Sequence, residues 1–273
     1  MKRTALSILI VSTSIIANAQ YYYKDIVSNN QLMADMKAYK ENKVRKVTLK
    51  SFEDNGIESE SFFCEKKISK NYRKTTLFTR ADIAPASLFT SILDKDGKLL
   101  STNDSSSFSV TEIRYSYDDK QRIRSIFSTI RAIEEFNNSI TEEHIYSYQN
   151  NILSKMIRIK NGRDSTAVLF STDEKGNIIL EKDTKNGTKF YYYYDNKNRL
   201  TDIVQANEFT KNLKPDYMFE YNNEGQITQM TAVEEGSNNY FVWKYNYENG
   251  MRVKERCFTN EKRLMGSMEY EYK

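Results

Sequence analysis

The chain has little of several residue types on which many catalytic and metal sites depend. Its 273 residues include two cysteines, two prolines, nine glycines and a single histidine, His144. One histidine excludes histidine-rich metal sites, and the sequence contains neither a Cys-x-x-Cys motif nor a cluster of potential zinc ligands. We therefore expect no metal centre and no cofactor.

The chain also lacks an excess of charge of one sign. It has 41 Lys and Arg against 37 Asp and Glu. A near-neutral, mixed surface gives no clustered basic face for nucleic acid or an anionic membrane. The most basic run, 40–50, alternates Lys and Arg with Val44, Val47 and Leu49, as a solvated strand face does. We expect no nucleic-acid partner.

Long hydrophobic runs are absent except at the N-terminus. There Lys2 and Arg3 precede the apolar run 5–16, and Ala17-Asn18-Ala19 follows it. This pattern predicts a secretory signal peptide cleaved after Ala19. A membrane anchor is the alternative, but the run is well short of the roughly 20 residues that span a bilayer. We expect an exported protein, periplasmic or extracellular, with no transmembrane helix after signal removal.

The segment 28–39 has helical periodicity. Leu32, Met36 and Tyr39 recur at spacings of four and three, which places them on one helix face. We predict one short N-terminal helix that packs this face on the first strands; a receptor-binding helix is the alternative.

From Val44 onward, period-two alternation replaces the helical pattern, and two classes of turn recur. Asn-Gly is a strong hairpin signal, because a type I′ turn needs positive φ at both central positions. It occurs at 55–56, 161–162, 186–187 and 249–250, with Asn-Asn at 150–151 as a weaker version. The second class has four residues, begins with Asp or Asn, and ends in a residue expected to be left-handed. Its copies are 94–97, 118–121, 173–176, 195–198 and 222–225.

An aromatic-x-aromatic strand end precedes most of these turns, and Leu or Ile follows them. Tyr115-x-Tyr117 before Ile123 and Tyr192-x-Tyr194 before Leu200 are examples. The copies recur at about 22 to 31 residues, the range of repeat arrays, with room for two strands and two turns each. Consecutive hairpins of this kind make an antiparallel meander.

We therefore predict an all-β fold of about 16–18 strands in a strongly curved single sheet, since large flat sheets curl, split or close. At 123–126, 200–203 and 227–230 two apolar residues lie three positions apart, which would put them on opposite faces of a regular strand. We predict a β-bulge at each place, which returns both residues to one face. Three regions follow: a signal peptide (1–19), the helix with the first hairpins (20–90), and the hairpin-repeat array (91–273), which continues from 44–90.

The segment 187–200, GTKFYYYYDNKNRL, resembles the YD repeat of Rhs-type and teneurin-type proteins, in which Gly precedes Tyr-x-Tyr-Asp and Gly-Arg-Leu follows. The segment 115–123 is the next copy, and the resemblance covers about residues 91–273. The departures include Asn198 and Gln121 for Gly, and Thr172 for Tyr. The resemblance implies a β-sheet shell of wound repeats, which in that family often encloses a toxin or mediates adhesion. This chain is far shorter and shows no toxin-like tail.

The residues that could act in catalysis lack the partners that catalysis needs. His144 precedes Tyr146-x-Tyr148 at even spacing, which indicates a structural histidine on the aromatic face rather than a general base. Asp94-x-Asp96-Gly97 lacks the closing acid of an EF-hand and reads as a turn. We expect no enzymatic activity.

In most strands the aromatic residues occupy alternate positions and so lie on one face of the sheet. Aromatic residues at the other positions predict a ligand-binding face. Tyr191 and Tyr193 point away from the aromatic face of their strand, and Tyr240 and Met218 share this off-parity position. Exposed aromatic patches often mark interaction sites, and rigid hydroxylated rings suit sugars or a partner protein. The alternative is that the loop 207–215 or the N-terminal helix covers these residues.

Cys64 and Cys257 belong to the first and last hairpins. We predict no disulfide between them, because an open meander holds its ends far apart; a closed barrel would reverse this argument. Taken together, the sequence predicts a non-enzymatic exported protein with a binding, adhesion or structural role, and a carbohydrate or cell-envelope protein as partner. The alternatives are a carbohydrate-active enzyme and an outer-membrane β-barrel.

Overall fold

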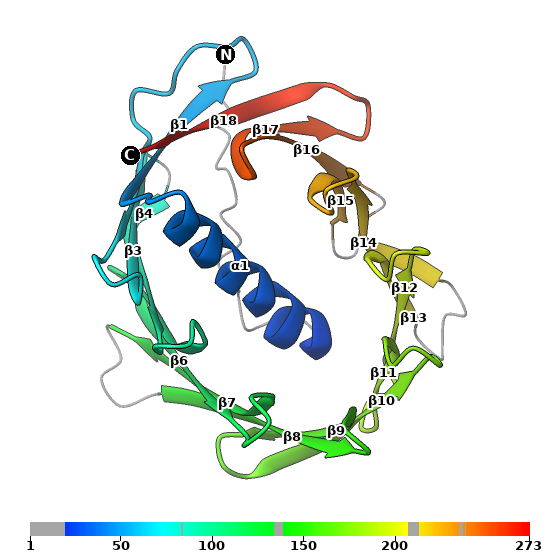
Figure 1. The fold of residues 1–273 in the computed structure, drawn as a ribbon. Helices are drawn as coiled ribbons and strands as arrows, with labels where there is room; N and C mark the ends of the chain where they lie inside the picture. The colour runs from blue at the N-terminus through cyan, green and yellow to red at the C-terminus, as the bar shows by residue number, and fades with distance from the viewer. Residues whose placement is uncertain (1–19, 83, 134–138, 207–212, 235–236, 238) are drawn as a thin grey trace.

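A computed structural model describes residues 20–82, 84–133, 139–206, 213–234, 237 and 239–273. The predicted signal peptide lies outside these residues. Eighteen antiparallel strands follow one another around a single sheet, each paired with its neighbours in sequence. Because β1 also pairs with β18, the sheet closes into a barrel (Figure 1).

The strands are short and regular in length. Their bounds are β1 Lys46–Glu53, β2 Phe63–Ile68, β3 Lys74–Ala81, β4 Ala84–Leu93, β5 Leu99–Ser106, β6 Ser109–Tyr117, β7 Ile123–Ala132, β8 Ser139–Gln149, β9 Ile152–Lys160, β10 Asp164–Thr172, β11 Ile178–Asp183, β12 Lys189–Tyr194, β13 Leu200–Ala206, β14 Leu213–Tyr221, β15 Ile227–Val233, β16 Tyr240–Glu248, β17 Met251–Thr259 and β18 Leu264–Tyr272.

The predicted all-β antiparallel meander is confirmed, but the open curved sheet is wrong. Seven residue pairs join the first strand to the last, from Val47 opposite Tyr272 to Glu53 opposite Gly266. Closure follows from the twist that accumulates over many strands, and it removes the two unpaired edges that an open sheet would expose. At this seam inward-facing residues of β1 pair with inward-facing residues of β18, as Val47 does with Tyr272. The inward face of the wall is therefore continuous across the seam.

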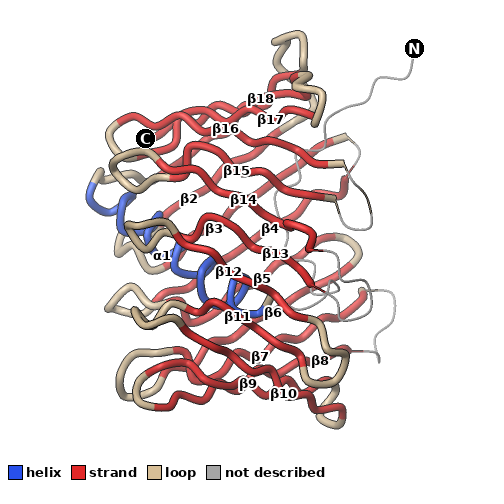
Figure 2. The backbone as a smooth tube through the Cα atoms, turned by 90° about the vertical axis from the view of Figure 1, so that its right-hand side faces the viewer, coloured by secondary structure: helices blue, strands red, loops and turns tan. Residues whose placement is uncertain are grey.

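The N-terminal helix lies inside the barrel and not on its outer face (Figures 1 and 2). A π-helical turn, η1 Tyr22–Val27, continues directly into α1 Ser28–Glu41. The prediction of a helix is confirmed. The helix was predicted to pack on the first strands, but it contacts strands all around the barrel interior. A wall of this many strands encloses more space than its own side chains fill, and the helix occupies that space.

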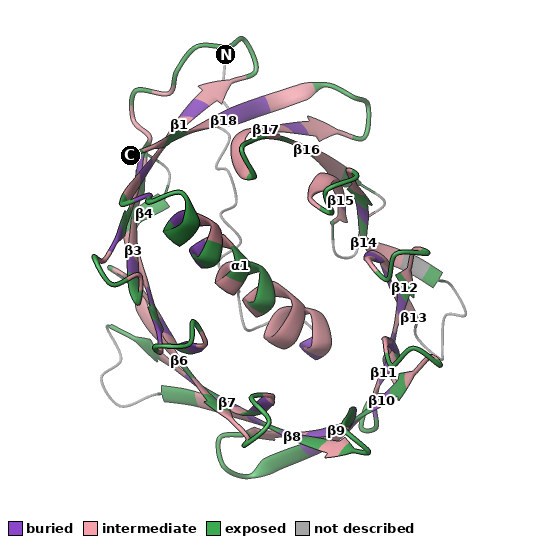
Figure 3. Ribbon diagram, viewed as in Figure 1, coloured by how far each residue is buried: buried purple, intermediate pink, exposed green. Residues whose placement is uncertain are grey.

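Two clusters of buried side chains join the helix to the wall. Buried residues, purple in Figure 3, lie both on the helix and on the strands around it. The first surrounds the N-terminal turns, where Tyr21 lies among Tyr146, Met156 and Phe190. The second surrounds the C-terminal half, where Met36 and Tyr39 lie among wall residues of β1, β2, β4 and β18 that include Val47. The helix therefore crosses the interior and forms part of both clusters.

The predicted turn chemistry is largely confirmed. The last residue of every four-residue turn is left-handed, including the non-glycines Gln121 and Asn198 with φ of 62° and 60°. Positive φ at both central positions occurs at 150–151, 161–162 and 249–250. At 55–56 and 186–187 only the glycine is left-handed, so the type I′ prediction is wrong for those two turns. The predicted bulges are present, since Tyr117 pairs with Ile123 and Ser116 with Ser125, leaving one extra residue.

The second aromatic residue of the repeat has a defined hydrogen bond. Tyr221 at the end of β14 donates its hydroxyl to the carbonyl of Leu200 at the start of β13, at 2.7 Å. We name this contact the repeat latch. The same bond, at 2.6–2.9 Å, joins Tyr117 to Leu99, Tyr148 to Ile123, Tyr194 to Ile178, Tyr247 to Ile227 and Tyr272 to Arg252. Each latch ties the end of one strand to the start of the strand before it.

The first residue of the four-residue turns also has a local role. Asp195 accepts hydrogen bonds from the backbone N–H groups of Lys197 and Arg199, each at 2.9 Å. Asp118 accepts the corresponding bonds from Lys120 and Arg122. The recurring Asp therefore satisfies two backbone donors that the tight turn leaves without ladder partners.

The two cysteines are separate buried thiols. Barrel closure places β17 and β2 three strand spacings apart, about 14 Å across the sheet, which exceeds the reach of a disulfide. The sequence argument placed the two cysteines at distant ends of an open sheet. That argument is wrong, because the first and last hairpins are neighbours in the barrel. Burial raises the pKa of both thiols, that of Cys257 to about 12.

Candidate functional site

All four residues of the predicted ligand face lie on the outside of the barrel wall. Phe190 and Tyr192 are each only 1% exposed and point inward, so Tyr191 and Tyr193 point outward on the same strand. Met218 lies between the inward-facing Tyr217 and Phe219. On β16, Tyr245 points inward. Tyr240 and Val242 occupy the alternate positions of this strand and therefore point outward.

Strand register places two of the four residues, Tyr193 and Met218, in one line with Asp202 between them. Tyr193 pairs with Asp202, and Asp202 pairs with Met218, so the three side chains form a line across β12, β13 and β14. The line continues through Thr231 and Val242 to Phe258 on β17. We name Tyr193, Met218, Val242 and Phe258 the outer apolar row.

The other two predicted residues lie beside this row. Tyr191 is two residues from Tyr193 on β12 and pairs with Leu180 and Val204. Tyr240 lies on β16, four strands from β12, which is about 19 Å at ordinary strand spacing. The structure therefore groups Tyr191, Tyr193 and Met218 and leaves Tyr240 at a distance.

The exposure of these side chains bears on the alternative that they are covered. Tyr193 is 47% exposed, Tyr240 37% and Met218 36%. The N-terminal helix lies inside the barrel and covers none of them. Of the loop 207–215, residues 207–212 lie outside the described part of the chain.

Polar groups interrupt the outer apolar row. Asp202 stands between Tyr193 and Met218 and has no hydrogen-bond or ion-pair partner among the described residues. Glu220 accepts a hydrogen bond from the side-chain amide of Gln229 on the neighbouring strand. The row thus combines aromatic and aliphatic side chains with the carboxylate of Asp202, and Glu220 and Gln229 lie beside it.

Inside the barrel, His144 joins the helix to the wall. Its Nδ1 lies 2.5 Å from Asp25 Oδ2 on η1, and its Nε2 lies 2.8 Å from Glu142 Oε1 on β8. Tyr146 donates its hydroxyl to the same oxygen of Asp25 at 2.5 Å. Burial alone would lower the pKa of His144, but the two carboxylates outweigh it and raise this pKa to about 9. At neutral pH an imidazolium therefore lies between two carboxylates.

Glu181 on β11 is a second contact between the wall and the helix. It is fully buried, and it accepts hydrogen bonds from the backbone N–H groups of Tyr21 and Tyr22, each at 3.0 Å, and from the hydroxyl of Tyr192 at 2.8 Å. Burial raises the pKa of Glu181 to about 7, against the effect of these three donors. The carboxylate caps the start of the helix.

The sequence did not identify these two acids. A signal was present for Asp25, which lies seven residues before Leu32 and eleven before Met36 and so falls on the apolar helix face. A buried acid on an apolar face needs a partner. Glu181 gave a weaker signal, because the bulge in its hairpin obscures its parity.

These interior groups hold the helix against the wall. His144 already holds a proton and both of its ring nitrogens are bonded, so it is not an available base. In the described part of the chain, no group of three or more His, Cys, Asp or Glu is arranged to hold a metal ion.

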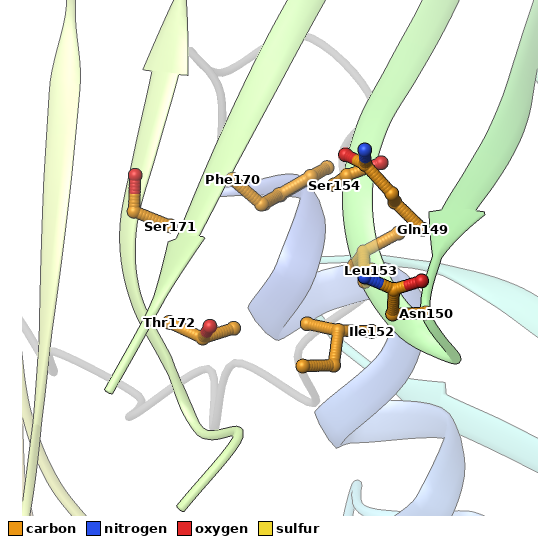
Figure 4. A pocket seen from close by; sticks show the side chains of 8 residues that line it. All are labelled: Gln149, Asn150, Ile152, Leu153, Ser154, Phe170, Ser171 and Thr172. Carbon is orange, nitrogen blue, oxygen red and sulfur yellow. The ribbon is translucent and has the colours of Figure 1, made fainter. Parts of the chain in front are cut away.

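A small cavity of about 270 Å³ opens where β9 and β10 separate (Figure 4). Pairing between these strands ends at Lys155 opposite Leu169, beyond which the wall parts. Its lining is Gln149, Asn150, Ile152, Leu153, Ser154, Phe170, Ser171 and Thr172. None of these is an ionisable side chain, and none belongs to the predicted ligand face.

None of the helices in the described residues is both long enough and apolar enough to cross a membrane.

Comparison with known proteins gave matches only among solved structures, since no family model and no curated protein sequence matches. A porin-like protein from Bacteroides uniformis is 12% identical over 84% of this chain and 98% of its own, with a TM-score of 0.38. The TcdB2-TccC3-TEV structure is 12% identical over 79% of this chain, which spans 12% of that chain, with a TM-score of 0.36. The Photorhabdus luminescens Tc holotoxin pore is 9% identical over 78% of this chain and 16% of its own, with a TM-score of 0.28. At these TM-scores the likenesses carry no argument about function.

Proposed function

We propose that this protein is an exported, non-enzymatic binding protein whose outer apolar row takes a glycan. The observation that carries the proposal is the line of Tyr193, Asp202 and Met218. In it a carboxylate that has no partner among the described residues stands between two side chains that are 47% and 36% exposed. Tyr191, two residues away on the same strand, extends this surface.

The chemistry of the row favours a sugar over a purely apolar ligand. Tyrosine rings offer rigid faces to the C–H side of a sugar ring at low entropic cost. The Asp202 carboxylate accepts hydrogen bonds from sugar hydroxyls, and hydrogen bonds to a charged acceptor are the stronger ones. A polar group inside an apolar patch penalises partners that cannot satisfy it.

The remainder of the outer surface supports contact with water. Lys50 pairs with Glu271 at 2.7 Å across the seam, and Lys254 pairs with Glu269 at 2.8 Å on the next strands. Charged side chains in the middle of outward-facing strands would be costly against lipid.

Two further parts of this proposal come from the sequence. Export rests on the signal-peptide pattern before Gln20, and N-terminal sequencing of exported protein tests it: retention of Met1 would refute cleavage after Ala19. Kinship with YD repeats rests on the Tyr-x-Tyr-Asp strand ends, and the repeat latch and the Asp turns give those recurring residues a physical purpose.

The binding proposal is tested with a glycan array and calorimetry on the mature chain. Replacement of Tyr191, Tyr193 and Tyr240 by Ser should abolish glycan binding and leave the melting temperature within about 2 °C, because exposed sites contribute little to stability. Asp202→Asn should weaken binding about tenfold. The matched control is Phe63→Ser with Phe78→Ser, two outward rings 39% and 37% exposed elsewhere on the wall, which should bind as wild type.

Each other outcome has a definite meaning. Marked destabilisation of the triple variant would show that a covered second core, not a binding face, occupies this position. Binding of a cell-envelope protein, with no glycan bound, would show that the outer apolar row takes a protein and not a glycan. Turnover of a bound glycan would move the protein to the enzyme alternative.

A further inference from the structure

The start of the helix lies in an acidic environment inside the barrel. Gln20 is only 7% exposed, and its backbone carbonyl accepts the first helical bond, from the N–H of Lys24 at 2.9 Å. Its side-chain amide donates to Asp216 on β14. Glu181 accepts the next two backbone N–H groups, those of Tyr21 and Tyr22.

A further buried acid in this region has an unused acceptor. Asp183 is 1% exposed and lies on the inward face of β11, two residues or about 7 Å along the strand from Glu181. Its Oδ1 accepts from the N–H groups of Lys185 and Asn186, but Oδ2 is buried with no hydrogen-bond partner among the described residues. A buried carboxylate oxygen without a donor is costly, so Asp183 has room for a further donor. The described cation that interacts with Asp183 is Arg158, whose Nε is likewise buried without a hydrogen-bond partner among the described residues.

The balance of charge points the same way. Glu181 and Asp216 accept hydrogen bonds from residues 20–22, and Asp25 lies on η1 itself, where it contacts His144. The strongest influences on the pKa of Glu181 are burial, its three hydrogen bonds and the negative charge of Asp25, with no cation among them. Of the neighbouring acids, Asp25 is paired with His144 and Asp183 interacts with Arg158, so Glu181 is the acid whose strongest interactions include no cation.

We propose that this acidic seat, formed by Glu181, Asp216 and Asp183, binds the α-ammonium group of Gln20 that cleavage after Ala19 creates. Adjacent backbone nitrogens are about 3–4 Å apart, so the nitrogen of Gln20 lies within about 7 Å of the Glu181 carboxylate. A free ammonium group brings three donors and one positive charge to that position. The inference rests on the proposed processing, and it makes the new chain end a part of the folded core.

The seat also controls a chemical fate of the chain end. An N-terminal glutamine cyclises when its uncharged α-nitrogen attacks the side-chain Cδ: an N–C bond forms and the side-chain nitrogen leaves as ammonia. In the seat the α-nitrogen is held as ammonium and the side-chain amide is held by Asp216. Gln20 therefore remains uncyclised in the folded protein.

The test compares two chains that begin at Gln20 or at Ala19, released from a fusion partner, each with Glu181 and with Glu181→Gln. The extra residue moves the ammonium group and changes no other side chain. With Glu181 present, the chain that begins at Gln20 should have an unfolding equilibrium constant about tenfold smaller, as expected for a charge-assisted bond to a buried acceptor. With Glu181→Gln the difference should fall below about twofold. Equal constants for the two wild-type chains, or the same difference in the variant pair, overturn the inference.

A second measurement needs no variant. Mass spectrometry of the chain that begins at Gln20 should show loss of ammonia at least about tenfold more slowly in native buffer than in denaturant. Equal rates overturn the seat. N-terminal sequencing of exported protein reports on processing by itself, so a failure of processing and a failure of the seat are distinguishable.

Discussion

At the scale of single residues, the tyrosines of the repeat divide into two groups by parity. Tyr192 and Tyr221 face inward, where a hydroxyl needs a partner, and each donates to a specific acceptor. Tyr193 faces water and needs none. Parity could be read from the sequence, whereas the acceptors could not, because Leu200 lies 21 residues before Tyr221 and its carbonyl carries no side-chain signal.

Removal of one repeat latch should cost a measurable part of stability. Tyr221→Phe keeps the ring, with Arg199 stacked at 4.7 Å, and removes the hydrogen bond to the Leu200 carbonyl. We expect the free energy of unfolding to fall by about 1–2 kcal/mol in urea titrations, because a half-buried carbonyl loses its donor. Tyr193→Phe is the control and should change it by less than about 0.5 kcal/mol. Equal effects of the two changes would contradict the latch.

His144 should make stability depend on alkaline pH. Its pKa rises from 6.5 to about 9 in the folded state, so the protonated form stabilises the fold fully below pH 6.5. That contribution is lost as the pH rises through 9, and it amounts to about 3 kcal/mol. We expect the stability difference between wild type and His144→Gln to shrink over this window in denaturation experiments at fixed salt. A constant difference from pH 6 to 10 would show that His144 is neutral in the fold.

At the scale of elements, the helix is the part that sequence periodicity placed least well. The spacing of Leu32, Met36 and Tyr39 identified one apolar face and suggested a surface helix packed on a sheet. Inside the barrel the helix meets wall on several sides, and Tyr21 and Tyr22 pack there too. Periodicity reports which residues prefer burial, and it does not report how many surfaces surround them.

The position of the helix gives a direct prediction. Met36 is 5% exposed within the second cluster, whereas the side chain of the next residue, Lys37, is 79% exposed. Met36→Ala should lower the free energy of unfolding by about 2–4 kcal/mol, as deletions in a packed core do. Lys37→Ala should lie within about 0.5 kcal/mol of wild type. A small effect of Met36→Ala in chemical denaturation would place the helix outside the core.

At the scale of the whole molecule, closure decides the architecture. The wall continues from β18 to β1 with the same inward parity, so apolar residues of the first strand meet those of the last. The prediction of an open sheet treated its first and last strands as free edges. In the barrel the accumulated twist brings them together and removes the exposed ladder groups.

A cross-link at the seam tests closure. Thr48 and Glu271 are direct partners on the outer face of β1 and β18, and paired Cα atoms about 5.5 Å apart suit a disulfide. Thr48→Cys with Glu271→Cys should form an intramolecular bond on oxidation, seen by non-reducing peptide mass spectrometry, and raise the melting temperature. Thr48→Cys with Lys254→Cys is the control, since Lys254 lies one strand further away. A cross-link found only between two chains would mean that the sheet does not close on itself.

The sequence by itself determined the hairpin, because its signals act over short distances. The Asp turns, the left-handed Gln121 and Asn198, the bulges and the inward aromatic parity each depend on residues within one repeat. They also placed Tyr191, Tyr193, Met218 and Tyr240 on the outer face. Tertiary structure alone decided what depends on the path around the whole wall: the seam, the helix in the interior, and the acids that receive its first turn. Glu181 meets Tyr21 across 160 residues, and only a closed wall fixes that distance.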